Sequence, residues 1–153
     1  PRQRSTLPEA IAEAVTRPNM RFVPIKNKEQ QDIQSLHRYR QRVVQQRTAL
    51  ANQIRGLLGE YGLVAPQGIG CLRKKLPQFL ENQDNHLTNL ALEIFSQLHQ
   101  ELLEADERVK VLDQRIAKVC HQNEACQKIR QIEGIGPLTA TALVAAIGEV
   151  SNF

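Results

Sequence analysis

The chain has 153 residues, which is enough for one domain or for one small domain with an extended helical element. Hydrophobic residues make up 41 % of it, but aromatic residues only 4 %, and there is no Trp. This composition favours helices packed through Leu, Ile, Val and Ala over an aromatic-rich β-sandwich. The net charge of +4 and the pI near 9.2 permit a nucleic-acid partner without requiring one.

The three cysteines, Cys71, Cys120 and Cys126, are an odd and widely spaced set, which argues against a disulfide framework and for a reducing cytoplasm. Cys120 and Cys126 fit no closed zinc pattern, so we interpret them as structural thiols and expect no metal. No apolar run approaches the roughly 18 residues that a membrane span needs, and Pro1 to Ser5 do not begin a signal peptide.

The first expected elements are short. Pro8 to Val15 reads as a helix, with proline in its first turn and acids near its start. Arg21 to Ile25 looks extended, and Pro24 restricts it to an edge strand or a connector.

A long helix is predicted from Lys28 to Tyr61. Asn27 is placed to cap it, and Gln30 completes a capping box. The apolar residues recur at spacings of about three and four, which predicts a coiled-coil-like seam: Ile33, Leu36, Val43, Leu50, Ile54, Leu57 and Tyr61. Some 34 residues at about 1.5 Å each give a rod of about 50 Å.

A second rod of similar length is predicted from Thr88 to Cys120. Its apolar stripe is Ala91, Ile94, Leu98, Leu102, Ala105, Val109, Leu112, Ile116 and Val119. Between the rods we expect a stop at Gly62, a loop over 65–70, a short helix over 72–80 that is interrupted at Pro77, and a polar turn over 82–85. The predicted fold class is mainly α, in which the rods fold back as a long antiparallel hairpin.

Charge is distributed unevenly between the rods. From Ile33 to Gly59 there is no acid, whereas the second rod is rich in Glu and Asp. Arg38 and Arg42 point away from the apolar stripe, but Arg40 and Arg47 fall on it. An arginine in a seam needs a partner, which is either a carboxylate such as Glu101 on the other rod or a phosphate backbone.

The residues after the second rod predict a helix-hairpin-helix motif. Gly134, Ile135 and Gly136 suit a tight turn, and Pro137 suits the first turn of a new helix that Gly148 ends. Free amides at a helix start attract anions, and a nucleic-acid phosphate is the anion most often met there. The candidate binding residues are Gly134, Ile135, Gly136, Thr139, Lys128, Arg130, Arg38 and Arg42. An ordinary helical connection is the alternative.

No catalytic constellation is evident. The four histidines lie in unrelated segments, and none accompanies a recognisable Ser or Cys arrangement. Glu104, Asp106 and Glu107 point to different helix faces and are more simply a solvated surface than a metal site.

Four segments carry a family resemblance. Arg17–Lys26, Glu29–Asp32 and Gln46–Leu58 closely resemble DEDD-type insertion-sequence transposases, the insertion sequence 110-like recombinases that work with a bridge RNA. Ile132–Gly148 is similar to the start of that family's C-terminal transposase domain. The resemblance implies three parts: the end of a RuvC-like nuclease domain (1–26), a long-helix coiled-coil linker (27–122), and the start of the transposase domain (123–153).

The resemblance also implies binding partners and a cellular location for the chain. It implies DNA and a structured guide RNA as binding partners, and self-association through the long helices, in a bacterial or archaeal cytoplasm.

Two of the family's metal-binding aspartates would fall near Arg4 and Leu7, which cannot bind a divalent metal. Its catalytic serine would lie beyond Phe153, and nothing positions Ser151 to replace it. We therefore expect a non-catalytic fragment without a cofactor, although Mg is expected for the full-length family. The rival function is a structural dimerisation module that binds no nucleic acid.

Overall fold

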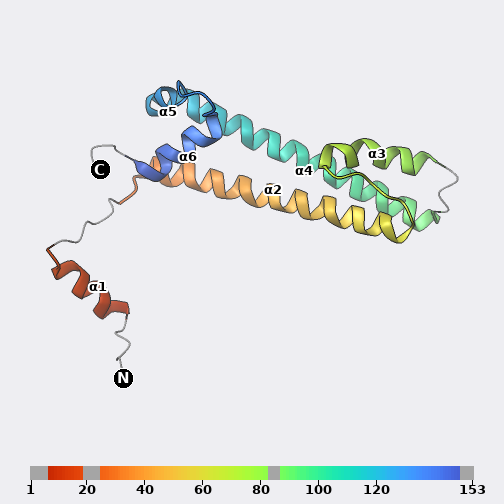
Figure 1. Cartoon of the computed structure of the whole chain (residues 1–153), viewed down its shortest axis with the longest axis horizontal. Coiled ribbons are helices and arrows are strands. Elements are labelled where there is room, and N and C mark those ends of the chain that lie inside the picture. Colours follow the sequence, from red (N-terminus) through yellow and green to blue (C-terminus); the bar gives the residue numbers. More distant parts are fainter. Residues whose placement is uncertain (1–6, 19–24, 83–86, 149–153) are drawn as a thin grey trace.

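The computed structural model describes residues 7–18, 25–82 and 87–148, and these form helices without a strand (Figure 1). The six helices are α1 (Leu7–Thr16), α2 (Lys28–Glu60), α3 (Ile69–Glu81), α4 (Asn89–Gln122), α5 (Glu124–Ile129) and α6 (Pro137–Ile147). The prediction of a mainly α fold is confirmed. The expected extended segment near Arg21 and most of the expected turn over 82–85 lie outside the described residues.

The ends of the two long helices follow their sequence signals. The Asn27 side chain accepts a hydrogen bond from the Gln30 N–H at 2.8 Å, and the Gln30 side chain accepts one from the Asn27 N–H at 3.0 Å. Gly62, at a positive φ of 76°, ends α2 in a Schellman motif, because the Leu63 N–H reaches the Leu58 carbonyl at 2.9 Å. Thr88 caps α4 through a bond from the Ala91 N–H.

Helices α2 and α4 lie side by side and run in opposite directions (Figure 1). Their seam has a narrow middle, made by Val43, Val109 and Leu112. It widens at the end where α3 joins, into a cluster that includes Ile54, Leu58, Leu72, Leu76, Phe95 and Leu102. Burial of such side chains contributes about 1.5–3 kcal/mol each, so this end holds most of the hydrophobic stabilisation.

The short helix α3 differs from the prediction. It begins at Ile69, inside the expected loop, and it continues through Pro77 without interruption. A proline inside a helix costs about 3 kcal/mol. The full burial of Leu72 and Leu76 against the long helices offsets that cost.

The α4 stripe is rotated at both ends relative to the prediction. Ile94 was expected in the seam but is 42 % exposed, whereas Phe95 is only 2 % exposed. The reason is α3, which covers the side of α4 that carries Phe95. At the other end Cys120 is fully buried and Val119 only partly, because α5 and α6 pack there.

The two arginines on the seam have carboxylate partners, which settles the alternative left open above. Arg40 pairs with Asp113, and Arg47 pairs with Asp106 at 2.9 Å. Glu101, the carboxylate suggested from the sequence, takes neither role. Asp106 also accepts from Arg73 of α3 at 2.9 Å, so one mostly buried carboxylate joins three helices.

Helix α6 lies across the free ends of α2 and α4. Its buried face consists of small residues, Ala140, Thr141 and Ala145, which let the backbones approach closely. Among its larger apolar residues, Leu138 and Ile147 are exposed, whereas Val144 packs on the cluster of Cys120, Cys126 and Ala140. None of the described helices is both long and apolar enough to cross a membrane.

We predict that Asp106→Asn lowers the free energy of unfolding by about 1–3 kcal/mol, because it removes the charged acceptor shared by Arg47 and Arg73. Urea unfolding followed by circular dichroism would measure the change. Glu107→Gln is the matched control, because Glu107 is exposed and its pair with Lys110 is worth under about 1 kcal/mol. Equal effects of the two substitutions would contradict the central role of Asp106.

Candidate nucleic-acid interface

The turn between α5 and α6 is held tightly from its start. Asn123 caps α5 by accepting a hydrogen bond from the Cys126 N–H at 3.0 Å. After α5 the chain continues in short turns, in which the Gln131 N–H reaches the Lys128 carbonyl and the Ile132 N–H reaches the Ile129 carbonyl. These contacts fix the direction in which the chain enters the glycine segment.

The glycine segment forms a four-residue turn closed by a bond from the Ile135 N–H to the Ile132 carbonyl at 3.2 Å. Gly134, third in this turn, has a φ of +84°, a conformation that favours glycine. Gly134 and Gly136 are exposed, and a Cβ at either would have open space around it. The Ile135 side chain packs inward against the Cys120, Cys126 and Ala140 cluster. The turn is therefore anchored by one apolar side chain while its backbone faces outward.

The start of α6 presents unused amide groups. Gly136 is the N-cap and supplies no side-chain cap, and Pro137 has no N–H. Within the described part of the chain, the N–H groups of Leu138 and Thr139 have no hydrogen-bond acceptor, and neither do those of Gly134 and Gly136. Amides at the positive end of a helix form a suitable site for an anion. The Ile135 amide, expected to bind phosphate, is instead used inside the turn.

The charges near the turn are of mixed sign. Lys128 and Arg130 are exposed and form no ion pair among the described residues, so both are available to a partner. Glu133 is exposed in the turn itself and opposes them. A phosphate would therefore depend on the amides as well as on the two cations.

A hydrogen-bonded pair docks α6 on α2, and no sequence motif indicates this contact. The His37 Nε2 lies 2.9 Å from the Thr141 hydroxyl, which lies 2.8 Å from the Pro137 carbonyl. Because a carbonyl only accepts, the single Thr141 proton points to Pro137, and the His37 ring donates through Nε2. Gln34 adds a longer bond to the Ala145 carbonyl. The position of α6 and the glycine turn relative to α2 thus depends on a contact between His37 and Thr141, which are 104 residues apart in sequence.

Comparisons with known proteins bear on what this surface serves. A family model described as a transposase, of the DEDD type of insertion sequence 110, matches residues 9–63. The transposase for insertion sequence element IS1111A of Coxiella burnetii is 41 % identical over 145 residues, covering 95 % of this chain and 40 % of that protein. The probable family 20 transposase of Pseudomonas aeruginosa is 39 % identical over 146 residues, covering 95 % and 43 %.

By sequence, this chain is similar to DEDD-type insertion-sequence transposases. A third relative, the transposase for insertion sequence element IS1328 of Yersinia enterocolitica, is 31 % identical over 95 % of this chain. The chain spans about two fifths of the length of each of these relatives. No solved structure matches it significantly. The expected resemblance to this family is confirmed, and the bridge RNA stays a prediction.

The binding residues predicted from the sequence of this chain lie in two places, the segment from α5 to α6 and helix α2. Lys128, Arg130 and the residues of the glycine turn lie together between α5 and α6. Arg38 and Arg42 lie on α2, where both are exposed, and the Arg42 guanidinium sits 5.5 Å from the centre of the Tyr39 ring. Arg38 follows His37 directly, so it lies within one helical turn of the α6 contact.

The cysteines have the structural role that the sequence indicated. Cys120 and Cys126 are free thiols buried together in the cluster beneath the turn. Burial, and then the neighbouring Cys120, raise the pKa of Cys126 to about 11, so this thiol stays protonated at neutral pH. Among the described residues, no group of three or more His, Cys, Asp or Glu side chains could hold a metal ion.

We predict that the docking of α6 on α2 weakens in mild acid. Burial, and then the charge of Arg40, lower the pKa of His37 below its usual 6.5. The unfolded chain therefore binds a proton at a higher pH than the folded one does. The stabilisation is complete above about pH 6.5 and is lost as the pH falls through the lowered folded-state value.

The thermal midpoint of the chain, compared with that of a His37→Gln variant between pH 7.5 and 5.5, measures this effect. The wild-type midpoint should fall further, whereas the variant retains the contributions of the other three histidines. Parallel pH profiles for the two proteins would exclude His37 as the titrating group.

Proposed function

We propose that this chain binds duplex DNA through the turn between α5 and α6, and that it does so in the transposition of an insertion sequence. The relatives are transposases by name, which supports the process. The observation that carries the proposal is the set of outward amides of Gly134, Gly136, Leu138 and Thr139, beside the unpaired Lys128 and Arg130. We interpret α5, the turn and α6 as a helix-hairpin-helix motif whose amides hold a DNA phosphate.

The remaining parts have supporting roles in this proposal. Residues 27–122 act as a helical linker, and residues 123–153 act as the start of a transposase domain. Arg38 and Arg42 on α2 provide a second basic surface, for which a structured guide RNA is the proposed partner. Binding by such cations is electrostatic and sensitive to salt.

The salt dependence of binding to a short duplex tests the proposal. The double substitution Lys128→Gln with Arg130→Gln should reduce the slope of log affinity against log salt by about 1–2, because each phosphate contact contributes about 0.9. Fluorescence anisotropy of a labelled duplex from low to moderate salt provides the measurement.

A charge-matched control distinguishes the loss of direct phosphate contacts from a general loss of positive charge. Lys74→Gln with Lys75→Gln removes the same two charges from the exposed side of α3, at the end of the long helices opposite to the turn (Figure 1). This variant should retain the wild-type slope within about half a unit. Equal slopes in both double variants, or no duplex binding by the wild-type chain even at low salt, would refute the hairpin proposal.

We further propose that the chain binds DNA without cutting it. Two metal-binding aspartates of the resembled family would fall near Arg4 and Leu7, and neither of these side chains can hold a divalent cation. Incubation of supercoiled plasmid with the purified chain and Mg²⁺ or Mn²⁺ should leave the plasmid intact. Reproducible metal-dependent nicking that follows the protein through purification would contradict this.

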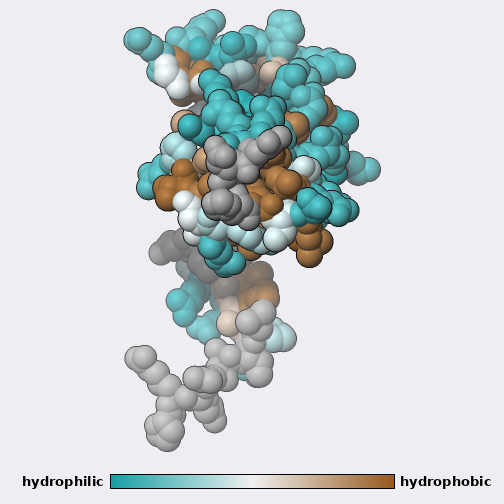
Figure 2. All heavy atoms as spheres, turned by 90° about the vertical axis from the view of Figure 1, so that its right-hand side faces the viewer, coloured by the Kyte–Doolittle hydropathy of each residue, from teal (hydrophilic) through white to brown (hydrophobic). Residues whose placement is uncertain are grey.

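Self-association is a second candidate function, and the far end of the molecule favours it. Figure 2 looks at this end and shows apolar side chains gathered among hydrophilic ones. The segments that meet there leave Val64 84 % exposed and Leu90 66 % exposed, together with Tyr61 and Ile94. Exposed apolar patches of this kind often mark protein interfaces. Sedimentation at increasing concentration tests it, with Val64→Ser and Leu90→Ser as variants that should shift the chain toward the monomer.

A further inference from the structure

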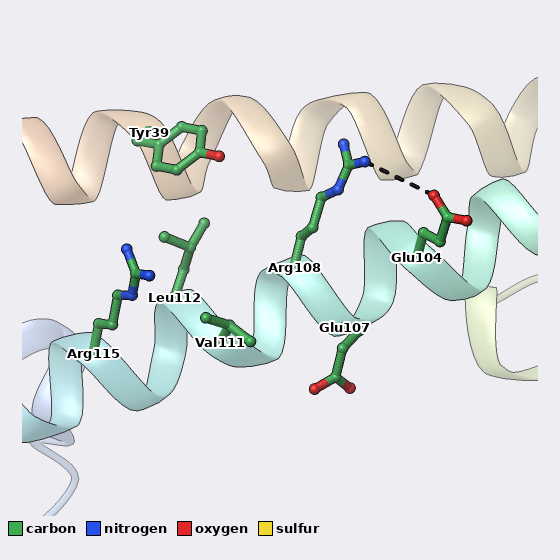
Figure 3. A pocket seen from close by; sticks show the side chains of 7 residues that line it. All are labelled: Tyr39, Glu104, Glu107, Arg108, Val111, Leu112 and Arg115. Carbon is green, nitrogen blue, oxygen red and sulfur yellow. Dashed lines mark ion pairs between the residues drawn. The ribbon is translucent and has the colours of Figure 1, made fainter.

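A cavity of about 330 Å³ lies between α2 and α4 (Figure 3). Tyr39 of α2 forms one wall, and α4 forms the other. Val111 and Leu112 provide an apolar floor. The volume is at the low end of the range for small-molecule sites, which suits a single flat group rather than a large ligand.

Tyr39 is unusual among the side chains along the seam. The residue is 46 % exposed, and within the described residues its hydroxyl makes no hydrogen bond. The Arg42 guanidinium lies over the ring, 5.5 Å from its centre. The ring thus contributes little to the core, while its apolar face stays accessible from the cavity.

The charges around this cavity are positive after pairing. Glu104 is paired with Arg108 at 3.8 Å, and Glu107 is paired with Lys110 at 3.3 Å. Figure 3 shows Arg108 and Arg115 directed toward α2, whereas Glu107 points away from it. Arg115 forms no ion pair in the described part of the chain. An anion at the rim would therefore meet Arg115 of α4, and the Arg42 guanidinium of α2 lies beside the Tyr39 ring.

We infer that this cavity binds one unpaired nucleotide of a single nucleic-acid strand, with its base stacked on Tyr39 and its phosphate at Arg115. An aromatic face beside arginines, above an apolar floor, is how proteins hold unstacked bases. A duplex cannot use the site, because its bases are stacked inside the helix. The Glu104 carboxylate is an acceptor for an amino group of the base or for a ribose hydroxyl.

This inference rests on the proposed function, because it gives the basic surface of Arg38 and Arg42 a defined ligand. It adds a preference for single strands that the glycine turn does not imply. A second copy of the chain could also cover Tyr39. The excess of arginine favours the nucleotide, since two copies would bring like charges together.

The chain itself offers a spectroscopic test, because it has no Trp and only two tyrosines. Tyr61→Phe leaves Tyr39 as the sole tyrosine and keeps an aromatic ring against Phe95, which Tyr61 contacts edge-on. Titration of this variant with a ten-nucleotide single strand, as RNA and as DNA, should quench the tyrosine emission through stacking. Quenching by either strand supports the site, and the comparison identifies the sugar. An emission unchanged at saturating strand overturns the inference.

Affinity variants complete the test by labelled-strand anisotropy. Tyr39→Leu should weaken single-strand binding by about 5–150-fold, the range expected for one base–aromatic stack, whereas Tyr39→Phe should stay within about threefold. Tyr61→Leu, at the other exposed tyrosine, is the matched control and should change little. Circular dichroism confirms that each variant folds.

The two proposals can fail separately. Loss of single-strand binding in Lys128→Gln with Arg130→Gln, but not in Tyr39→Leu, would overturn the nucleotide site and leave the hairpin proposal standing. Duplex binding that fails while Tyr39-dependent single-strand binding persists would refute only the hairpin. A dimer that Tyr39→Leu dissociates, with strand binding unchanged, would assign the cavity to a second copy instead.

Discussion

The contact between α2 and α4 determines where the other packed elements can lie. Arg40 with Asp113 and Arg47 with Asp106 tie the helices in one register, and Asp106 also takes Arg73. The apolar contact in the middle of the seam would define this register less firmly by itself, because it has only three buried residues, Val43, Val109 and Leu112. One end of the pair then accepts α3, and the other accepts α5 and α6. The glycine turn is thus presented at the tip of a rigid support rather than on a free segment.

Local signals predicted the boundaries of the long helices. Asn27 with Gln30, Thr88 and Gly62 act through neighbours only a few residues away, so their effect can be read from the sequence. The burial of Phe95 in place of Ile94 could not be predicted, because it depends on where α3 packs. The same packing allows Pro77 within a helix. Periodicity describes a face but does not say which neighbours will cover it.

The candidate site divides in a similar way. Gly134, Gly136 and Pro137 specify their own turn, and the structure has it where the sequence indicates. The bond between His37 and Thr141 joins distant segments, and a histidine among polar neighbours gave no sign of it. For Arg40 and Arg47 the need for an anionic partner was predictable from the cost of an unpaired charge. Its identity was not, because the register of α4 against α2 decides which carboxylate lies opposite each arginine.

The spacing of the seam pairs has a consequence for how such chains can vary in length. Arg40 and Arg47 are seven residues apart, and so are their partners Asp106 and Asp113, in reverse order along α4. Seven residues return a coiled-coil face to the same side, whereas one inserted residue rotates everything beyond it by about 100°. Insertions and deletions in one rod should therefore persist only as whole heptads with a matching change in the other. Length would then vary in paired steps of about 10 Å, and the tip would keep its orientation.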